Sequence, residues 1–118
     1  MDATLSGYTR LADSCDAEDI ELLGGHAAEA SSFLKALGHE GRLMILCHLC
    51  SGEKTVTELE NLLSSRQASV SQQLARLRLE GLVKYRRQGK TIYYTLSDTK
   101  ARQAIDLVHN LFCSPDTP

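Results

Sequence analysis

Apolar residues in the first half of the chain recur at helical spacing and predict two helices. From residue 20 to residue 37 they fall three or four positions apart, which predicts one amphipathic helix that ends at Gly38. The adjacent Gly24 and Gly25 weaken this helix locally. Its narrow apolar stripe fits two interpretations equally well, a seam that packs across a dimer axis or an ordinary core helix. Residues 40–50 are apolar almost all round, which predicts a short, buried second helix.

Two further helices and a hairpin are predicted in the second half. A capping box at Thr55 and Glu58 opens the third helix. The fourth helix ends at Gly81, a residue that suits a left-handed cap. Its buried face is predicted to carry Val70, Leu74 and Leu77.

The remaining pattern alternates between apolar and polar residues, as strands do. Residues 82–87 and 91–96 predict two strands. A tight turn at Gln88-Gly89 joins them, because glycine supplies the positive φ that such a turn needs. A last amphipathic helix follows the second strand, so that the predicted order is four helices, a hairpin and one helix.

This order of elements is typical of one fold. Two short helices joined by a tight turn and followed by a hairpin predict a winged helix-turn-helix, mainly α with a β-hairpin wing. The 118 residues fit one domain, which we place at residues 17–113. Residues 1–16 are polar and lack periodicity, which predicts a mobile N-terminal tail. Residues 114–118 are taken as a C-terminal tail.

The charge of the chain is distributed very unevenly. The whole sequence carries a formal net charge of −2. Between Arg66 and Lys90, however, seven side chains are basic and only Glu80 is acidic, a local balance of +6. Charge segregated in this way predicts a surface that meets a polyanion. A protein-interaction module with an acidic partner is the alternative, and strong salt-dependent binding to duplex DNA would disfavour it.

The fourth helix carries side chains suited to reading double-stranded DNA in the major groove. Glutamine can bind adenine bidentately, serine can donate or accept, and an alanine methyl can contact thymine. The basic residues of the hairpin suit phosphates or the minor groove. The predicted DNA-contacting residues are Arg66, Gln67, Ala68, Ser69, Ser71, Gln72, Arg76, Arg86, Arg87 and Lys90.

Several segments now support a family resemblance. The stretches 35–46, 57–59, 69–74, 79–83 and 89–94 resemble those of the ArsR/SmtB family of small winged-helix repressors. The resemblance implies a homodimer built from the first and last helices. It also implies repression by operator binding and release on sensing an inducer.

The sensing residues implied by the resemblance are cysteines. Arsenic-type members carry a Cys-x-Cys in the third helix, but residues 54–59 hold no thiol, and the zinc-type site is also absent from the last helix. Cys47 and Cys113 instead resemble the dithiol of the sulfide- and persulfide-responsive subgroup (SqrR/BigR-type). Such a pair senses persulfides and polysulfides. A polysulfide link also spans a longer gap than a disulfide, which needs Cα atoms within about 7 Å.

Two further thiols leave alternatives open. Cys50 is assigned to packing, and Cys15 lies in the predicted tail, where it is expected to be exposed. A metal- or metalloid-responsive repressor would combine Cys47 and Cys113 with one of them, although we expect no bound metal. A thiol-disulfide oxidoreductase built on Cys47 and Cys50 is disfavoured, because that motif belongs at a helix N-terminus and here it closes a helix.

The chain has no apolar run that suggests a membrane span or a signal peptide. We therefore expect a cytoplasmic protein whose cysteines rest reduced. No cofactor and no enzymatic activity are expected. The sequence does not identify the operator.

Overall fold

The computed structural model describes residues 16–64, 67–97 and 99–113. The two predicted tails therefore lie outside the described residues, except for Asp16. The chain divides into two compact units, Met1–Phe33 and Leu34–Pro118, and each is described by itself.

The first unit contains α2 (Ala17–Gly24) and most of α3 (Ala27–Leu37). Asp16 begins α2, because its carboxylate accepts a hydrogen bond of 2.9 Å from the N–H of Asp19. The single helix predicted over residues 20–37 is wrong, since a turn at residues 25–26 divides it. The glycine pair is the physical reason: each glycine costs a helix about 1 kcal/mol relative to alanine. The N–H of Gly25 caps α2 on the carbonyl of Glu21.

The second unit begins with the last turn of α3 and continues into α4 (Glu40–Leu49). His39 caps α4, because its Nδ1 accepts a 3.0 Å hydrogen bond from the N–H of Gly41. The helix buries Ile45, Leu46 and Leu49. The predicted second helix is therefore confirmed, but it is buried on one face only, because Met44 and Cys47 are exposed.

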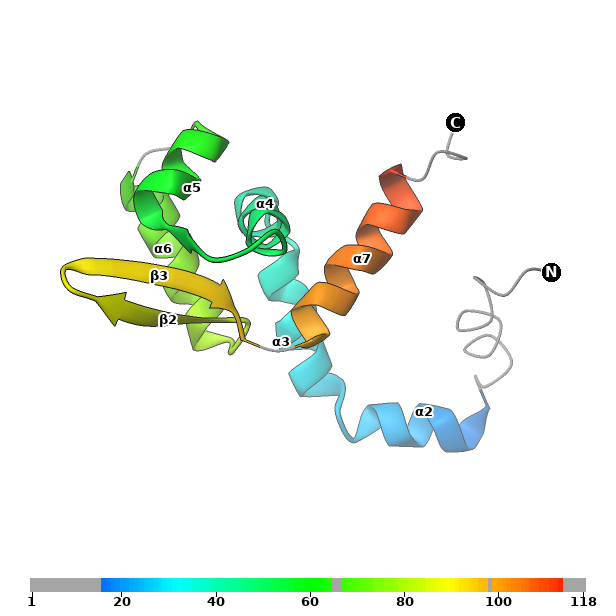
Figure 1. Cartoon of the computed structure of the whole chain (residues 1–118). Helices are drawn as coiled ribbons and strands as arrows, with labels where there is room; N and C mark the ends of the chain where they lie inside the picture. Colours follow the sequence, from blue (N-terminus) through cyan, green and yellow to red (C-terminus); the bar gives the residue numbers. More distant parts are fainter. Residues whose placement is uncertain (1–15, 65–66, 98, 114–118) are drawn as a thin grey trace. The chain divides into compact units, whose positions relative to one another are not determined.

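The helix-turn-helix consists of α5 (Val56–Leu63) and α6 (Gln67–Leu79), which pack against each other and against α4. Both hydrogen bonds of the capping box that opens α5 are present. Figure 1 shows the two helices beside α4, with the hairpin extending away from them. The predicted inner face of α6 is confirmed, because it buries Val70, Leu74 and Leu77.

The wing is a three-stranded antiparallel sheet in the order β1-β3-β2. Its strands are β1 (Lys54–Thr55), β2 (Val83–Gln88) and β3 (Thr91–Leu96). Gln88 pairs with Thr91, so the turn is Gly89-Lys90, one residue later than predicted. Gly89 supplies the left-handed φ of 63°. The short β1 was not predicted.

The last helix, α7 (Thr99–Cys113), packs against α4 and β3. Its first half buries Ala101 and Ile105, whereas Leu111 and Phe112 near its end are 57% and 73% exposed. Apolar residues predicted in the first helical stripe are also exposed, with Ile20 at 64% and Leu34 at 63%. Among the described residues, no helix is long and apolar enough to span a bilayer.

Candidate nucleic-acid interface and thiol pair

The outer face of α6 presents polar side chains opposite its buried leucines. The described residues that were predicted to read bases are all exposed: Ser69, Ser71, Gln72 and Arg76. Arg76 also forms an ion pair with Glu80, with 3.4 Å between Nε and Oε2. Gln67 and Ala68 lie in the first turn of α6, but their side chains are outside the described part. Arg66 lies entirely outside it.

The wing cations predicted to contact DNA differ in whether another side chain of the protein pairs with them. Arg86 is held by Glu53, with contacts of 3.0 Å from Nε and 2.6 Å from Nη2 to the two carboxylate oxygens. It also donates to Gln88 and lies 4.5 Å over the ring of Tyr93. The hydrogen bonds from Arg86 lower the pKa of the Glu53 carboxyl. Sequence reasoning missed Glu53, which lies 33 positions from its partner.

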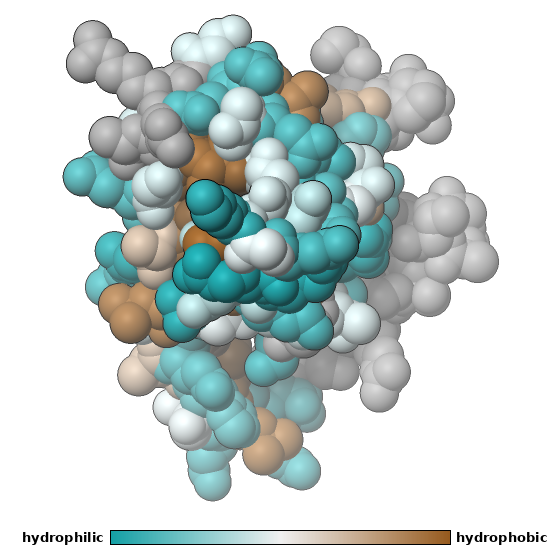
Figure 2. All heavy atoms as spheres, turned by 60° about the vertical axis from the view of Figure 1, so that its left-hand side comes forward, coloured by the Kyte–Doolittle hydropathy of each residue, from teal (hydrophilic) through white to brown (hydrophobic). Residues whose placement is uncertain are grey.

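Arg87 and Lys90, in contrast to Arg86, have no partner among the described residues. Both are exposed, and neither forms a hydrogen bond or ion pair with another described residue. Figure 2 brings the hairpin side of Figure 1 forward and shows mainly hydrophilic side chains on the face nearest the viewer. The predicted face is therefore polar. Among the wing residues predicted to contact DNA, Arg87 and Lys90 are the two cations without a partner in the described chain.

Two of the four cysteines come together in the structure. Cys47 on α4 and Cys113 at the end of α7 are both exposed and line one cavity of about 410 Å³. The cavity lies between these two helices, which are in contact. Its other lining residues are Leu43, Met44, Ile105, Val108, His109 and Phe112.

Cys50 does not line this cavity. Cys50 follows α4 as its C-cap and is half-buried. Burial raises the pKa of its thiol, and the charge of Arg102 partly opposes that effect. Arg102 also donates a 2.8 Å hydrogen bond to the carbonyl of Cys50, which ties α7 to the end of α4. Cys15 lies outside the described residues.

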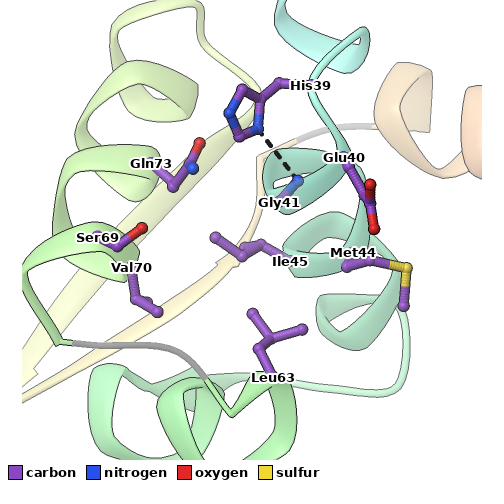
Figure 3. A pocket seen from close by; sticks show the side chains of 9 residues that line it. All are labelled: His39, Glu40, Gly41, Met44, Ile45, Leu63, Ser69, Val70 and Gln73. Carbon is purple, nitrogen blue, oxygen red and sulfur yellow. Dashed lines mark hydrogen bonds between the residues drawn. The ribbon is translucent and has the colours of Figure 1, made fainter.

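A second cavity, of about 380 Å³, lies between the start of α4 and α6. Figure 3 shows the His39 cap of α4 on one side and the side chain of Gln73 from α6 on the other. A Cβ at Gly41 would lie 3.0 Å from Nε2 of Gln73 and 3.2 Å from Cε1 of His39, so glycine there leaves room for these two side chains. Sequence reasoning assigned no role to these polar residues.

Over residues 16–64, 67–97 and 99–113, no group of three or more histidine, cysteine or acidic side chains is placed to hold a metal ion.

Comparisons with known proteins agree with this geometry. Residues 39–85 match a family model described as bacterial regulatory protein, arsR family. The chain is 44% identical over 90 residues to the biofilm growth-associated repressor of Agrobacterium fabrum, covering 76% of this chain and 77% of that protein. It is also 44% identical over 88 residues to the transcriptional activator HlyU of Vibrio cholerae, covering 75% of this chain and 82% of that protein.

The solved structures include a similar repressor. The transcriptional repressor BigR from Xylella fastidiosa matches with a TM-score of 0.75 and 41% identity, covering 83% of this chain and 97% of that one. The predicted winged helix-turn-helix fold is confirmed. The names of these relatives also support a transcriptional regulator in preference to an enzyme.

Proposed function

This chain belongs to the ArsR family of bacterial regulatory proteins, and we propose that it is an operator-binding repressor that reactive sulfur releases from DNA. The trigger is a cross-link between Cys47 and Cys113. That the chain is a DNA-binding transcriptional regulator follows from its family and fold. Repression and sulfur sensing are the proposed refinements, because one relative is named as an activator and another as a repressor.

We place the DNA contact on the outer face of α6 and on the wing. The exposed Ser69, Ser71 and Gln72 are suited to base edges, and Arg87 and Lys90 are suited to phosphates. The side chains of Arg66, Gln67 and Ala68 are assigned to the same contact from the sequence. Arg76 and Arg86 belong to it as well, although each is also paired with a carboxylate of this chain.

A homodimer would place two copies of α6 against two half-sites. Half-sites read by such dimers are about 34 Å apart, one helical turn of DNA. Exposed apolar residues on α2, α3 and α7 support dimer contacts by these helices, since burying them would remove apolar surface from water. These residues are Ile20, Leu23, Leu34, Leu111 and Phe112.

One observation carries the sensing proposal: Cys47 and Cys113 line the same cavity between α4 and α7. A link between the two sulfurs would tie α7 to α4, the helix that packs on α6. Such a link would change the placement of α6 against DNA. The coupling required is modest, of the order of 1–3 kcal/mol, or roughly 5- to 150-fold in affinity.

The test measures DNA affinity by fluorescence anisotropy. Reduced protein first selects a duplex from a random-sequence pool, and inorganic tetrasulfide is then added. We expect weaker binding for the wild type and for the control variant Cys50→Ser, and no response from Cys47→Ser or Cys113→Ser. If either of these last two variants still leaves DNA, the dithiol proposal is wrong. Release by zinc or arsenite, but not by tetrasulfide, would favour the metal-responsive alternative.

A further inference from the structure

The walls of the thiol cavity exclude charge. No lysine, arginine, aspartate or glutamate is among its lining residues, and His109 is its one titratable side chain besides the two thiols. Leu43, Met44 and Val108 help to close it with apolar surface. Its volume of about 410 Å³ lies within the usual range for small-molecule sites, about 300–1,000 Å³.

We infer that this cavity selects its inducer by polarity and takes an uncharged organic polysulfane, a chain of sulfur atoms with short apolar end groups. This inference rests on the proposed function, because it names the class of molecule that reaches Cys47 and Cys113. Apolar end groups gain from leaving water for such walls. A charged end group gains nothing from these walls, because no opposite charge lies among the lining residues.

The chemistry balances for a trisulfane, R–S–S–S–R. One cysteine thiolate attacks the central sulfur, the bond to an outer sulfur breaks, and RS⁻ leaves. The second cysteine thiolate attacks the same central sulfur and displaces the other RS⁻. The two thiolates that leave take up the two protons lost by the cysteines. The trisulfane is reduced to two RSH, and the two cysteines are oxidised to a Cys47–S–S–S–Cys113 link.

A pair of reagents with the same sulfur core separates polarity from reactivity. Diallyl trisulfide carries apolar end groups, whereas glutathione trisulfide carries charged ones. Intact-mass spectrometry of the reduced full-length protein follows the gain of one sulfur and the loss of two hydrogens. Each rate is divided by the rate of the same reagent with N-acetylcysteine. We expect the normalised rate for diallyl trisulfide to be higher by about tenfold, because its allyl groups gain free energy from contact with the apolar walls and the charged end groups do not.

A substitution at Val108, which lines the cavity, tests whether the apolar lining causes the preference. Val108→Lys places a cation at the cavity, so we expect it to lower the preference for diallyl trisulfide over glutathione trisulfide severalfold. Leu62→Lys is the control, because Leu62 is a half-exposed residue of α5 that does not line the cavity. Val108→Thr, which keeps the shape of the side chain, replaces the lysine variant if that protein does not fold. It should shift the preference in the same direction.

The outcomes distinguish this inference from the proposed function. Equal normalised rates in the wild type, or a preference unchanged by Val108→Lys, would overturn the inference while the dithiol mechanism stands. Loss of the dimer in Val108→Lys during size-exclusion chromatography would also overturn it, because a second copy would then fill the cavity. Failure of both reagents to link Cys47 to Cys113 would overturn this inference. Only if inorganic tetrasulfide also fails to link the two cysteines is the proposed function itself overturned.

Discussion

The proposed DNA-binding face and the thiol cavity belong to the same structural unit but differ in chemistry. The face consists of exposed serine, glutamine and cationic side chains on α6 and the wing, where water and salt reach every group. The cavity is walled by aliphatic and aromatic side chains, and its two thiols come from α4 and α7. We therefore expect ionic strength to change DNA binding strongly and thiol chemistry little.

Helix α4 lies between these two regions. Cys47 on α4 faces the cavity, and the chain after the helix leads to Glu53, which holds Arg86 of the wing. The hydroxyl of Ser51 donates to the carbonyl of His48 and accepts from Lys54, so the segment is fixed by short bonds. In the proposed mechanism, a shift of α4 on cross-linking would reach the wing through these hydrogen bonds. It would reach α6 directly, because α4 packs on α6.

The largest expected effect comes from the core on which both regions depend. Leu74 of α6 is fully buried. Leu74→Ala should lower the free energy of unfolding by about 2–5 kcal/mol, the usual cost of such a cavity. Leu79→Ala is the control on the same helix, because Leu79 is 84% exposed, and we expect a change within about 0.5 kcal/mol. Urea denaturation measures both, and equal destabilisation would contradict this assignment of the core.

Local signals predicted most of the helices and the hairpin. The capping box at Thr55 and the buried face of α6 involve residues a few positions apart, so the sequence pattern alone identified them. The pattern did not predict β1, because two residues are too few to show alternation. It also predicted one helix where Gly24 and Gly25 separate two, because the apolar residues keep the same spacing on both sides of the glycines.

The candidate site could be predicted only in part. Charge and side-chain type indicated the DNA-binding face, but the Glu53–Arg86 pair joins residues 33 positions apart and depends on the tertiary structure. Cys47 and Cys113 were paired through a family resemblance. Their shared cavity depends on how α7 packs on α4, which no local pattern encodes.

The second prediction separates the two regions by charge. Replacing Arg87 and Lys90 together with glutamine should weaken DNA binding by about tenfold at low salt. The slope of the logarithm of the binding constant against the logarithm of the salt concentration should also become less steep by about one to two. Each phosphate contact that is lost no longer releases a counterion. The rate of trisulfide formation at Cys47 and Cys113 should not change. Anisotropy over a salt series measures the first effect. Lys35→Gln, which removes one exposed cation outside α6 and the wing, is the control. If the variant and the wild type show the same dependence of the binding constant on salt, Arg87 and Lys90 do not contact phosphates.

The third prediction concerns the paired cation of the wing. Glu53→Gln removes the carboxylate that holds Arg86, so one acidic charge leaves the wing and one guanidinium becomes available. We expect DNA affinity to rise about threefold, as for other exposed pairs of modest strength. Arg86→Gln should weaken binding less than Arg87→Gln. If Arg86→Gln is the more damaging of the two, pairing with Glu53 does not weaken the contribution of Arg86 to the DNA contact, and this prediction is wrong.

The smallest expected effect lies at Cys50, next to the thiol cavity. Burial raises the pKa of its thiol, so at a given pH less of it is thiolate, the form that reacts. Iodoacetamide should therefore modify Cys47 and Cys113 severalfold faster than Cys50 near pH 7, and the gap should narrow as the pH rises toward about 9. Peptide mass spectrometry of timed samples measures the three rates. If Cys50 reacts as fast as Cys47 at neutral pH, it is a third candidate for the sulfur link.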